Sequence, residues 1–253
     1  MNSIERKLGI LKVLKESNSV EVNHLTKLFG VSKVTIRGDL DDLERKGMLI
    51  RTHGGAMLPE NEDLIRRLSH TLEERKEEKT AICRSALNLI KDGMNITIDS
   101  GSTTIHLARL VADWRISVIT NSLLVIQELL NSPTVELFVA GGILRKPSMS
   151  LMGAAAAFMF EQLHGDILFL GASGFSIEQG LTSTNIIEAE TKKNMIKNSN
   201  TVCLLADSSK KEKMFLAHIC GWDSIDYFIT DHLEEADRTR LAEQGVSVII
   251  SPS

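Results

Sequence analysis

Short apolar runs in the second part of the sequence end repeatedly in glycine, hydroxyl and amide residues. The run at 94–98, for example, is followed directly by the segment DSGSTT. Glycine lets a ligand approach the backbone, hydroxyl and amide groups hydrogen-bond to oxygen atoms, and a helix starting near Thr103 directs its positive end at an anion. Five segments share this character: Asp99-Ser100-Gly101-Ser102-Thr103-Thr104, Thr120-Asn121-Ser122, Ala140-Gly141-Gly142, Gly171-Ala172-Ser173-Gly174 and Asp207-Ser208-Ser209-Lys210.

Three basic residues accompany these segments. Arg145 follows the double glycine, Lys210 closes its own segment, and Lys192 lies on a helix expected at 186–197. Basic side chains together with hydroxyl groups suit a phosphate attached to a polyhydroxylated body. Any one segment could be an ordinary turn, and Arg145 and Lys192 could be surface charges, but five segments together indicate a binding cleft.

The elements that would position these residues alternate between strands and helices. Apolar, β-branched runs are separated by helical patterns, such as those at 103–112, 123–130 and 154–163. This alternation predicts an α/β domain with a parallel sheet covered on both faces. In such sheets ligands bind beyond the carboxyl ends of the strands, where all five segments fall. We assign 81–253 to this effector-binding domain and the charge-rich, glycine-free stretch 59–80 to a helical linker.

The charge is unevenly distributed along the 253 residues. The chain carries a net charge of −4, whereas residues 1–58 contain ten Lys or Arg against seven Asp or Glu, a balance of +3 that leaves −7 for the remainder. This asymmetry indicates a small module that faces a polyanion, joined to a larger domain with another task.

Composition also argues against several classes of protein. Three scattered cysteines without a C-x-x-C pair disfavour disulfides and a zinc site, so the sequence calls for no metal and no cofactor. No apolar run approaches the length of a membrane span. We therefore expect a cytoplasmic protein that has no contact with a membrane.

Residues 1–58 predict a winged helix-turn-helix domain. Helices are expected from Ser3 to about 17–18, over 22–29 and over 33–46. Gly30 can adopt a positive φ between the second and third helices, and Ser32 can cap the third. The following run MLIRTHGGAML reads as two strands with a tip at 52–55. In this arrangement the third helix enters the major groove of double-stranded DNA.

The third helix has a core face and a face that could read DNA. At 100° per residue, Ile36, Leu40 and Leu43 fall on the core side. The acidic residues at 39, 41, 42 and 44 would be repelled by phosphate, so we expect them to point away or to form intramolecular pairs. His53 could equally be a solvated loop residue. The candidate DNA contacts are Ser32, Lys33, Val34, Thr35, Arg37 and Gly38 on the helix, and Arg51 and His53 on the wing.

Three stretches of this domain resemble the DeoR family of bacterial transcriptional regulators. They are the positions Arg6, Ile10 and Leu14, the segment SKVTIRGDL at 32–40 and the segment RTHGGA at 51–56. Gly38 departs from the family pattern, which usually has a basic or small residue there. Glycine inside a helix costs about 1 kcal/mol relative to alanine, but it lets the helix lie closer to a base pair, so the departure bears on operator preference.

The resemblance extends through the second domain. It implies similarity to sugar-phosphate isomerases of the ribose-5-phosphate isomerase and glucosamine-6-phosphate deaminase type, and a phosphorylated sugar or sugar alcohol as effector. It also assigns to the cleft Glu188 and Lys192 of IEAETKKNMI. Relatives often keep an aspartate where this chain has Ser173 and a second carboxylate where it has Ser176. Because a hydroxyl does not accept a proton at neutral pH, these departures weigh against catalysis.

The sequence is therefore interpreted as a transcriptional repressor of a carbohydrate catabolism operon and not as an enzyme. It would bind double-stranded operator DNA and be released by a phosphorylated sugar or sugar alcohol. Paired operator half-sites imply a homo-oligomer, either a dimer or a tetramer. The alternative is a sugar-phosphate isomerase with an appended DNA-binding module.

Overall fold

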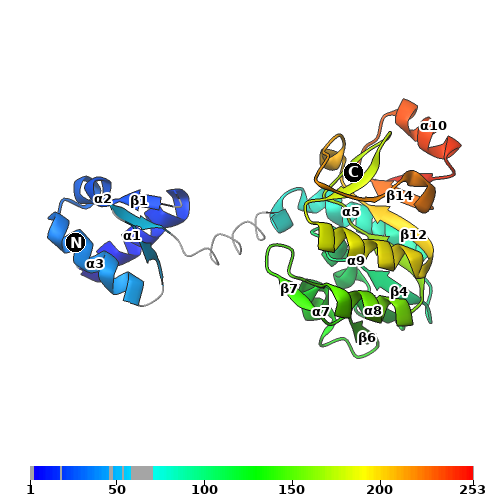
Figure 1. Ribbon diagram of the computed structural model, residues 1–253, viewed down its shortest axis with the longest axis horizontal. Coiled ribbons are helices and arrows are strands. Elements are labelled where there is room, and N and C mark those ends of the chain that lie inside the picture. The colour runs from blue at the N-terminus through cyan, green and yellow to red at the C-terminus, as the bar shows by residue number, and fades with distance from the viewer. Residues whose placement is uncertain (1–2, 18, 46–47, 53, 58–70, 253) are drawn as a thin grey trace. The chain divides into compact units, whose positions relative to one another are not determined.

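The computed structural model describes residues 3–17, 19–45, 48–52, 54–57 and 71–252 of the chain. These residues belong to two compact units, Met1–His70 and Thr71–Ser253, which we call the N-terminal and C-terminal domains (Figure 1). Of the expected linker 59–80, positions 59–70 lie outside the described residues, and 71–80 belong to the C-terminal domain. Within the described ranges no helix is long and apolar enough to cross a membrane.

The described residues of the N-terminal domain form three helices and a small antiparallel sheet. Its elements are α1 (Ser3–Ser17), β1 (Ser19–Glu21), α2 (Val22–Phe29), α3 (Lys33–Arg45), β2 (Ile50–Arg51) and β3 (Gly55–Met57). The sheet has the order β1-β3-β2. The apolar positions of α3 face the core as the periodicity predicts, because Ile36 and Leu40 are fully buried against Ile10 and Leu14 of α1.

Two local features fix the turns of this domain. Gly30 ends α2 with a φ of 65°, and its N–H donates to the Thr26 carbonyl. The Ser32 hydroxyl then accepts the Thr35 N–H at 3.1 Å, which caps α3. Gly55 of β3 lies opposite Glu21 of the paired strand β1, and a β-carbon there would stand only 1.8 Å from the Val20 carbonyl oxygen. The helix-turn-helix and the hairpin predicted from the sequence are thereby confirmed.

The C-terminal domain is organised around a seven-stranded parallel sheet. The sheet has the strand order β15-β14-β12-β9-β4-β5-β6. Its strands in chain order are β4 (Asn95–Ile98), β5 (Ser117–Thr120), β6 (Glu136–Val139), β9 (Gly165–Leu170), β12 (Ser199–Leu205), β14 (Tyr227–Thr230) and β15 (Ser247–Ile250). In register, Ile98 of β4 lies opposite Phe169 of β9 and Thr120 of β5.

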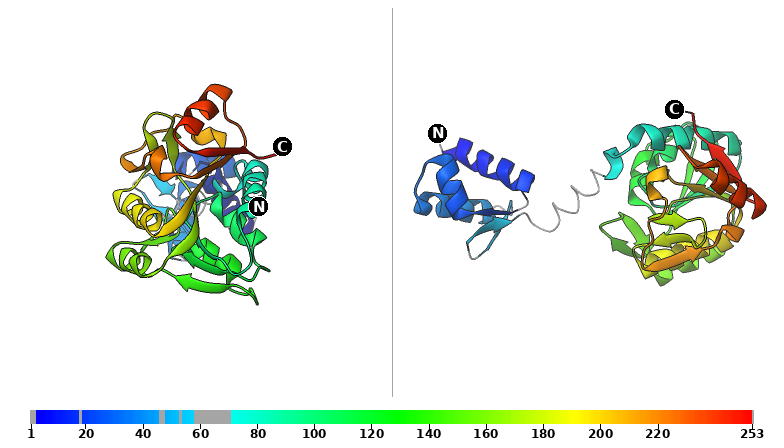
Figure 2. Two further views of the ribbon diagram at one scale, coloured as in Figure 1. Left: turned by 90° about the vertical axis from the view of Figure 1, so that its right-hand side faces the viewer. Right: turned by 90° about the horizontal axis from the view of Figure 1, so that it is seen from above.

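Helices cover both faces of this sheet (Figures 1 and 2). Alternate strand residues point to opposite sides, so that Ile167 and Phe169 enter one core while Leu168 and Leu170 enter the other. One core includes residues of α5 (Lys76–Ala86), α6 (Thr104–Leu110) and α7 (Leu123–Leu129). The other includes residues of α8 (Ala154–Gln162), α9 (Ile186–Lys197) and α10 (Glu235–Glu243). The predicted α/β architecture is confirmed.

Two small antiparallel sheets interrupt the expected alternation. A hairpin of β7 (Ile143–Arg145) and β8 (Ser150–Met152) follows β6. A three-stranded sheet contains β10 (Gly174–Ser176), β11 (Gly180–Ser183) and β13 (Ala217–Cys220). Neither small sheet was expected from the sequence, because strands of three or four residues give too few positions to establish a period of two.

Candidate functional site

The strand order of the large sheet reverses between β4 and β9. From β4 the chain continues to β5 and β6 on one side, and from β9 it continues to β12, β14 and β15 on the other. In parallel α/β sheets such a reversal opens a crevice beyond the carboxyl ends of the two strands. Asp99 and Ser100 follow β4 at this point, and Gly171 follows β9. Three of the residues expected at the effector site are thus brought together.

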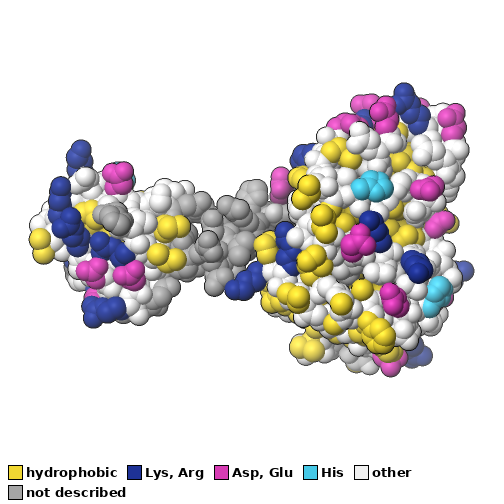
Figure 3. All heavy atoms as spheres, in the orientation of Figure 1, with side chains coloured by type: hydrophobic (Ala, Val, Ile, Leu, Met, Phe, Trp, Pro, Cys, Tyr) yellow, Lys and Arg dark blue, Asp and Glu magenta, His cyan; other side chains and the backbone are white. Residues whose placement is uncertain are grey.

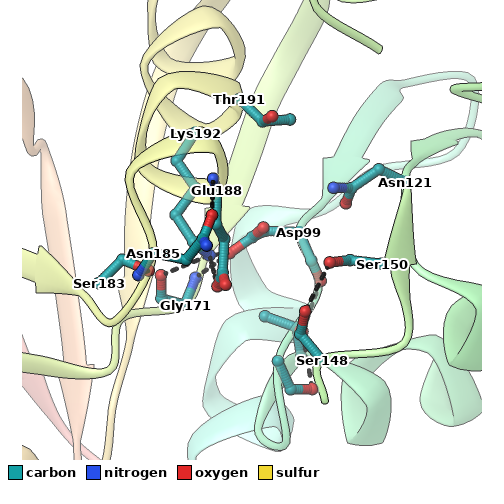
Figure 4. Close-up of polar contacts among 12 residues, drawn as sticks. Asp99, Asn121, Ser148, Ser150, Gly171, Ser183, Asn185, Glu188, Thr191 and Lys192 are labelled. Carbon is teal, nitrogen blue, oxygen red and sulfur yellow. Dashed lines mark hydrogen bonds and ion pairs between the residues drawn. The ribbon is translucent and has the colours of Figure 1, made fainter. Parts of the chain in front are cut away.

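A buried ion pair between Asp99 and Lys192 of α9 lies at the reversal (Figure 4). Asp99 is fully buried and Lys192 is 2% exposed, so this lysine is not a surface charge. Asp99 Oδ2 also accepts the Gly171 N–H at 2.9 Å, and Lys192 Nζ donates to the Gly171 carbonyl at 3.1 Å. Glu188, one turn earlier on α9, places its Oε1 3.8 Å from Lys192 Nζ. The positive charge of Lys192 is therefore balanced by carboxylates, and its side chain is held against the ends of two strands.

Three buried polar atoms around this ion pair have no hydrogen-bond partner within the described residues. They are Asp99 Oδ1, Ser100 Oγ and Asn121 Oδ1. Asn121 uses one N–H of its Nδ2 to donate to the Leu151 carbonyl at 2.9 Å, while its Oδ1 accepts no hydrogen bond from the described residues. A buried polar atom without a partner costs about 1–3 kcal/mol. Two of the three atoms only accept hydrogen bonds, so a molecule that presents hydroxyl groups would satisfy them.

The loop between β4 and α6 is closed on itself by Thr104. Its hydroxyl donates to the Asp99 carbonyl at 2.6 Å and contacts the Gly101 carbonyl oxygen at 3.2 Å. Thr103 and Thr104 are buried, whereas Gly101 and Ser102 are half-buried. Within the described part of the chain, no backbone hydrogen bond is donated by the N–H groups of residues 100–103. Such free N–H groups are suited to an anion.

The β7–β8 hairpin lies on the opposite side of Asp99 from α9 (Figure 4). It places Ser148 and Ser150 beside the site, and their hydroxyl oxygens are 2.7 Å apart. Arg145 contacts the Ser148 hydroxyl at 3.5 Å. Sequence reasoning missed both serines, although the closely spaced pair in the segment RKPSMS, after a double glycine, was the available signal.

The predicted residues Ser122, Gly141 and Gly142 serve this hairpin. Ser122 is buried, forms a bridge to Ser150 and caps α7. Gly142 has a φ of 133°, and a β-carbon there would lie 2.5 Å from the Met152 carbonyl oxygen, so only glycine fits where the hairpin begins. Gly141 precedes it in an exposed position.

Asp207 and Lys210 belong to a different cluster. Asp207 follows β12 and is buried, its Oδ1 accepts the Ser209 N–H, and it lies 3.7 Å from Arg75 Nε. Arg75, which precedes α5, also donates to Asp231 Oδ2 at 2.6 Å. Burial by itself would raise the pKa of Asp231, but hydrogen bonds from Ser208 and the charge of Arg75 lower it overall. The contacts of Asp207 are therefore with the start of the domain and not with Asp99.

The two serines that replace carboxylates of the isomerase-like pattern have structural partners. Ser173 is half-buried and its N–H donates to the Thr182 carbonyl at 3.1 Å. Ser176 is buried in β10, where its carbonyl accepts the Trp222 indole N–H at 2.9 Å. The carboxylates at the Asp99 site are thus those of Asp99 and Glu188, and the former is held by Lys192. Within the described ranges, no group of three or more His, Cys, Asp or Glu side chains is placed to hold a metal ion.

In the N-terminal domain, the predicted reading face of α3 is open to solvent. Lys33, Val34, Arg37 and Gly38 are exposed, Ser32 is exposed before them, and Thr35 is half-buried. Figure 3 shows Lys and Arg side chains gathered on the edge of this domain where α2 and α3 meet. Nothing lies within 4 Å of a β-carbon built at Gly38. The face can therefore approach another surface closely.

The acidic residues of α3 are engaged within the domain, as expected from the sequence. Asp39 pairs with Arg6, and Asp42 pairs with Lys7 and Arg45. Asp41 pairs with Arg51, which also contacts the carbonyls of Arg37 and Gly55 at 3.2 Å. Arg51 therefore joins the wing to α3 in this structure. His53, the other predicted wing contact, lies outside the described residues.

Comparison with known proteins gives matches over both domains. Residues 6–62 match the DeoR-like helix-turn-helix domain, and residues 74–232 match the DeoR C terminal sensor domain. The chain is 34% identical to the HTH-type transcriptional regulator GolR of Listeria innocua serovar 6a, over 99% of this chain and 100% of that protein. It is 30% identical to the glycerol-3-phosphate regulon repressor of Escherichia coli K12, over 91% of this chain and 92% of that protein.

A partial likeness to a solved structure was also found. Ribose 5-phosphate isomerase A from Methanocaldococcus jannaschii matches with a TM-score of 0.39 and 20% sequence identity, over 60% of this chain and 55% of that one. The match to the two named regulators, in contrast, extends over nearly the whole length of each protein. By both of its domains the chain belongs to the DeoR family, a family of transcriptional regulators and not of enzymes.

Proposed function

We propose that this chain represses a carbohydrate catabolism operon and is released from its operator by a phosphorylated sugar or sugar alcohol. The observation that carries the proposal is the set of unpartnered acceptors around the buried Asp99–Lys192 pair. A regulator needs a site that recognises a metabolite without converting it. Asp99 binds a lysine through one oxygen and leaves the other for a ligand, which suits recognition of hydroxyl groups rather than proton abstraction.

The phosphate of the effector is assigned to the loop 100–104. Its free N–H groups and the hydroxyls of Ser100 and Ser102 can donate to phosphate oxygens. Asp99 Oδ1 and Asn121 Oδ1, being acceptors, would repel a phosphate and instead receive sugar hydroxyls. The relative named as a glycerol-3-phosphate regulon repressor is consistent with a phosphorylated effector.

DNA recognition is assigned to the exposed face of α3. The three aspartates of this helix pair with Arg6, Lys7, Arg45 and Arg51. We therefore infer that Lys33 and Arg37 determine the local charge near the helix start. Arg37 is exposed and is the candidate for a bidentate contact to a guanine. We also propose a dimer or a tetramer, since helix-turn-helix proteins bind paired half-sites.

Helix α5 can couple the two functions. At its start, Arg75 is bound to Asp231, and Lys79 Nζ donates to the Thr71 carbonyl at 2.6 Å. Further along, the Cys83 thiol donates to the Thr103 carbonyl at 3.2 Å. The helix therefore contacts both the loop assigned to phosphate, at Thr103, and the start of the C-terminal domain, at Thr71. An effector shifts the protein toward the DNA-free state only by its difference in affinity between the two states.

The DNA assignment is tested with Arg37→Ala. Losing a base contact should weaken operator binding tenfold or more without lowering the melting temperature, because the side chain is exposed. Arg45→Ala is the matched control, since Arg45 is on the same helix, is 77% exposed and pairs with Asp42. Operator binding by fluorescence anisotropy at fixed salt measures both. Equal affinities of Arg37→Ala and the unmodified chain would refute the assigned face.

The effector assignment is tested by a thermal-shift screen. The panel contains glucose, galactose, mannose, fructose and tagatose 6-phosphates, ribose and arabinose 5-phosphates, glucitol and galactitol 6-phosphates, and inorganic phosphate. Binding to the folded state raises the melting temperature, and we expect at least one organic phosphate to do so and to release operator DNA. If none does either, the proposed effector class is wrong.

A further inference from the structure

The β7–β8 hairpin has no role in the fold's large sheet, yet it is firmly attached beside the effector site. Leu151 N–H donates to the Asn121 carbonyl at 2.8 Å, and Leu123 N–H donates to the Met149 carbonyl at 2.9 Å. The Asn121 side chain adds a third bond, from Nδ2 to the Leu151 carbonyl. The positions of Ser148 and Ser150 are therefore fixed relative to the end of β5.

The backbone at the tip of this hairpin is unusual. Met149 adopts a φ of 48°, one of three non-glycine residues with positive φ in the described part of the chain. A residue with a side chain is strained in this region, and the conformation persists only where the surrounding structure fixes it. Here the conformation places the neighbouring hydroxyls of Ser148 and Ser150 within 2.7 Å of one another. The strain thus accompanies a particular arrangement of two polar groups.

We propose that this hairpin is the specificity-determining wall of the effector site, and that Ser148 and Ser150 select among effectors by contacting their hydroxyl groups. The inference rests on the proposed function, because it concerns the same site. It adds which part of the effector is read, and by which residues. The phosphate remains in loop 100–104, and the hairpin contacts the polyhydroxylated body.

The unpartnered acceptors around the site support this division. Asp99 Oδ1 and Asn121 Oδ1 are buried acceptors without partners, and Figure 4 shows Asn121 and Ser150 on the same side of Asp99. A phosphate has only acceptors at neutral pH and would be repelled there, whereas hydroxyl groups can donate to both oxygens. The part of the effector next to the hairpin is therefore the sugar body.

The serine pair can adapt to the configuration of a sugar carbon. In the Ser148–Ser150 contact either hydroxyl can be the donor. The pair can therefore present a donor or an acceptor to the ligand, whereas the unpartnered oxygens Asp99 Oδ1 and Asn121 Oδ1 can only accept. Arg145 Nη1 lies 3.5 Å from the Ser148 hydroxyl oxygen. A site that hydrogen-bonds a substrate hydroxyl discriminates strongly against a molecule that lacks it or directs it elsewhere.

The test compares Ser148→Ala and Ser150→Ala with the unmodified chain. Dissociation constants are measured by calorimetry for the panel above, which contains pairs of sugar phosphates that differ at one hydroxyl: glucose and galactose, glucose and mannose, fructose and tagatose, and ribose and arabinose. Ser199→Ala is the matched control, because that hydroxyl donates to the Met195 carbonyl at 2.9 Å and is away from the site. Ser148 is half-buried, so its variant stays informative if the fully buried Ser150 proves necessary for folding.

The proposal expects a change in selectivity. For at least one pair bound by the unmodified chain, the ratio of dissociation constants should change about threefold to tenfold in a serine variant and stay constant in Ser199→Ala. Inorganic phosphate should bind all four chains equally.

Other outcomes overturn the proposal. Unchanged ratios mean that the hairpin does not read the sugar. A uniform loss of affinity that includes inorganic phosphate means that the serines hold the phosphate instead. If the unmodified chain binds no organic phosphate at all, the proposed function fails as well, which distinguishes that failure from a failure of the hairpin alone.

Discussion

Each domain contains a buried carboxylate paired with a basic side chain, but the two pairs are completed differently. In the N-terminal domain, Asp39 Oδ2 accepts a hydrogen bond from Arg6 Nε at 2.5 Å, and Asp39 Oδ1 accepts one from Arg6 Nη2 at 3.2 Å. Each oxygen of this carboxylate therefore has a partner. In the C-terminal domain, Asp99 Oδ2 is bound by Lys192 and Gly171, while Oδ1 has no partner within the described residues. A buried ion pair therefore does not by itself mark a binding site. At Asp99, the unpaired Oδ1 is the observation that supports our proposal of an effector site.

The difference fits two separate tasks. The Arg6–Asp39 pair connects α1 to α3 and so fixes the orientation of the helix that we assign to DNA. The Lys192–Asp99 pair connects α9 to the ends of β4 and β9 and holds an acceptor in a fixed position without satisfying it. In our proposal, the Arg6–Asp39 pair holds the DNA-binding helix in place, whereas the Lys192–Asp99 pair is itself part of the effector site.

The largest effect is expected at Asp99. Asp99→Ala leaves the buried Lys192 without its main partner, which typically costs about 3–5 kcal/mol, and it removes an acceptor for the effector. Combining it with Lys192→Met removes both charges and should recover most of the stability but none of the effector response. Urea unfolding and the thermal-shift panel measure the two properties separately. A double variant that still responds to the panel would contradict the role of this pair.

The next effect concerns the pair in the N-terminal domain. Asp39→Ala should strip Arg6 of its partner, loosen α3 from α1 and abolish operator binding, because the reading face depends on that contact. The thermal shift of the C-terminal domain with the panel should stay unchanged. Asp41→Ala is the control, since Asp41 is exposed on the same helix and should have a much smaller effect on stability. Retained operator binding in Asp39→Ala would show that the pair is dispensable.

The third effect concerns His106, a buried histidine of α6 that stays neutral in the folded protein. Burial, together with the charges of Arg109, Lys79 and Lys76, lowers the pKa of His106 to about 4 from its ordinary 6.5. As the pH falls from 6.5 toward 4, the unfolded chain binds a proton that the folded chain does not, so the C-terminal domain should lose stability in this window. His106→Asn should flatten this dependence. Urea midpoints at several pH values check it, and parallel curves for both chains would be inconsistent with a neutral His106.

The smallest effect is expected at Gly38. Replacing it with alanine should stabilise α3 by about 1 kcal/mol, because an added β-carbon meets no atom within 4 Å. The same methyl group would stand between the helix and a base pair, so operator affinity should fall while the melting temperature of the N-terminal domain rises. A lower melting temperature, or a higher operator affinity, would contradict this reading of the face.

Much of the fold could be predicted from the sequence because its elements carry strong periodic signals. Ile36, Leu40 and Leu43 recur at helical spacing and are buried, and Gly30 and Ser32 mark the turn between α2 and α3. Strand β9 contains a continuous apolar run at 167–170, as expected of a strand covered on both faces. These signals are local, so they can be recognised in the sequence without knowledge of the tertiary structure.

The site could be predicted only in part. The segment after β4 was found because small and hydroxyl residues cluster there, but its partner residues come from distant elements. The sequence does not reveal that Asp207 contacts Arg75 rather than the Asp99 group, because that depends on strand order. Ser148 and Ser150 were missed since a hairpin of two three-residue strands has almost no periodicity.

The most direct test of this account is a crystal structure of the chain with the panel member that gives the largest thermal shift. We expect ligand hydroxyl groups within hydrogen-bond distance of Asp99 Oδ1 and Asn121 Oδ1, and the phosphate at 100–104. A ligand bound elsewhere, with both oxygens still unpaired or occupied only by water, would contradict it.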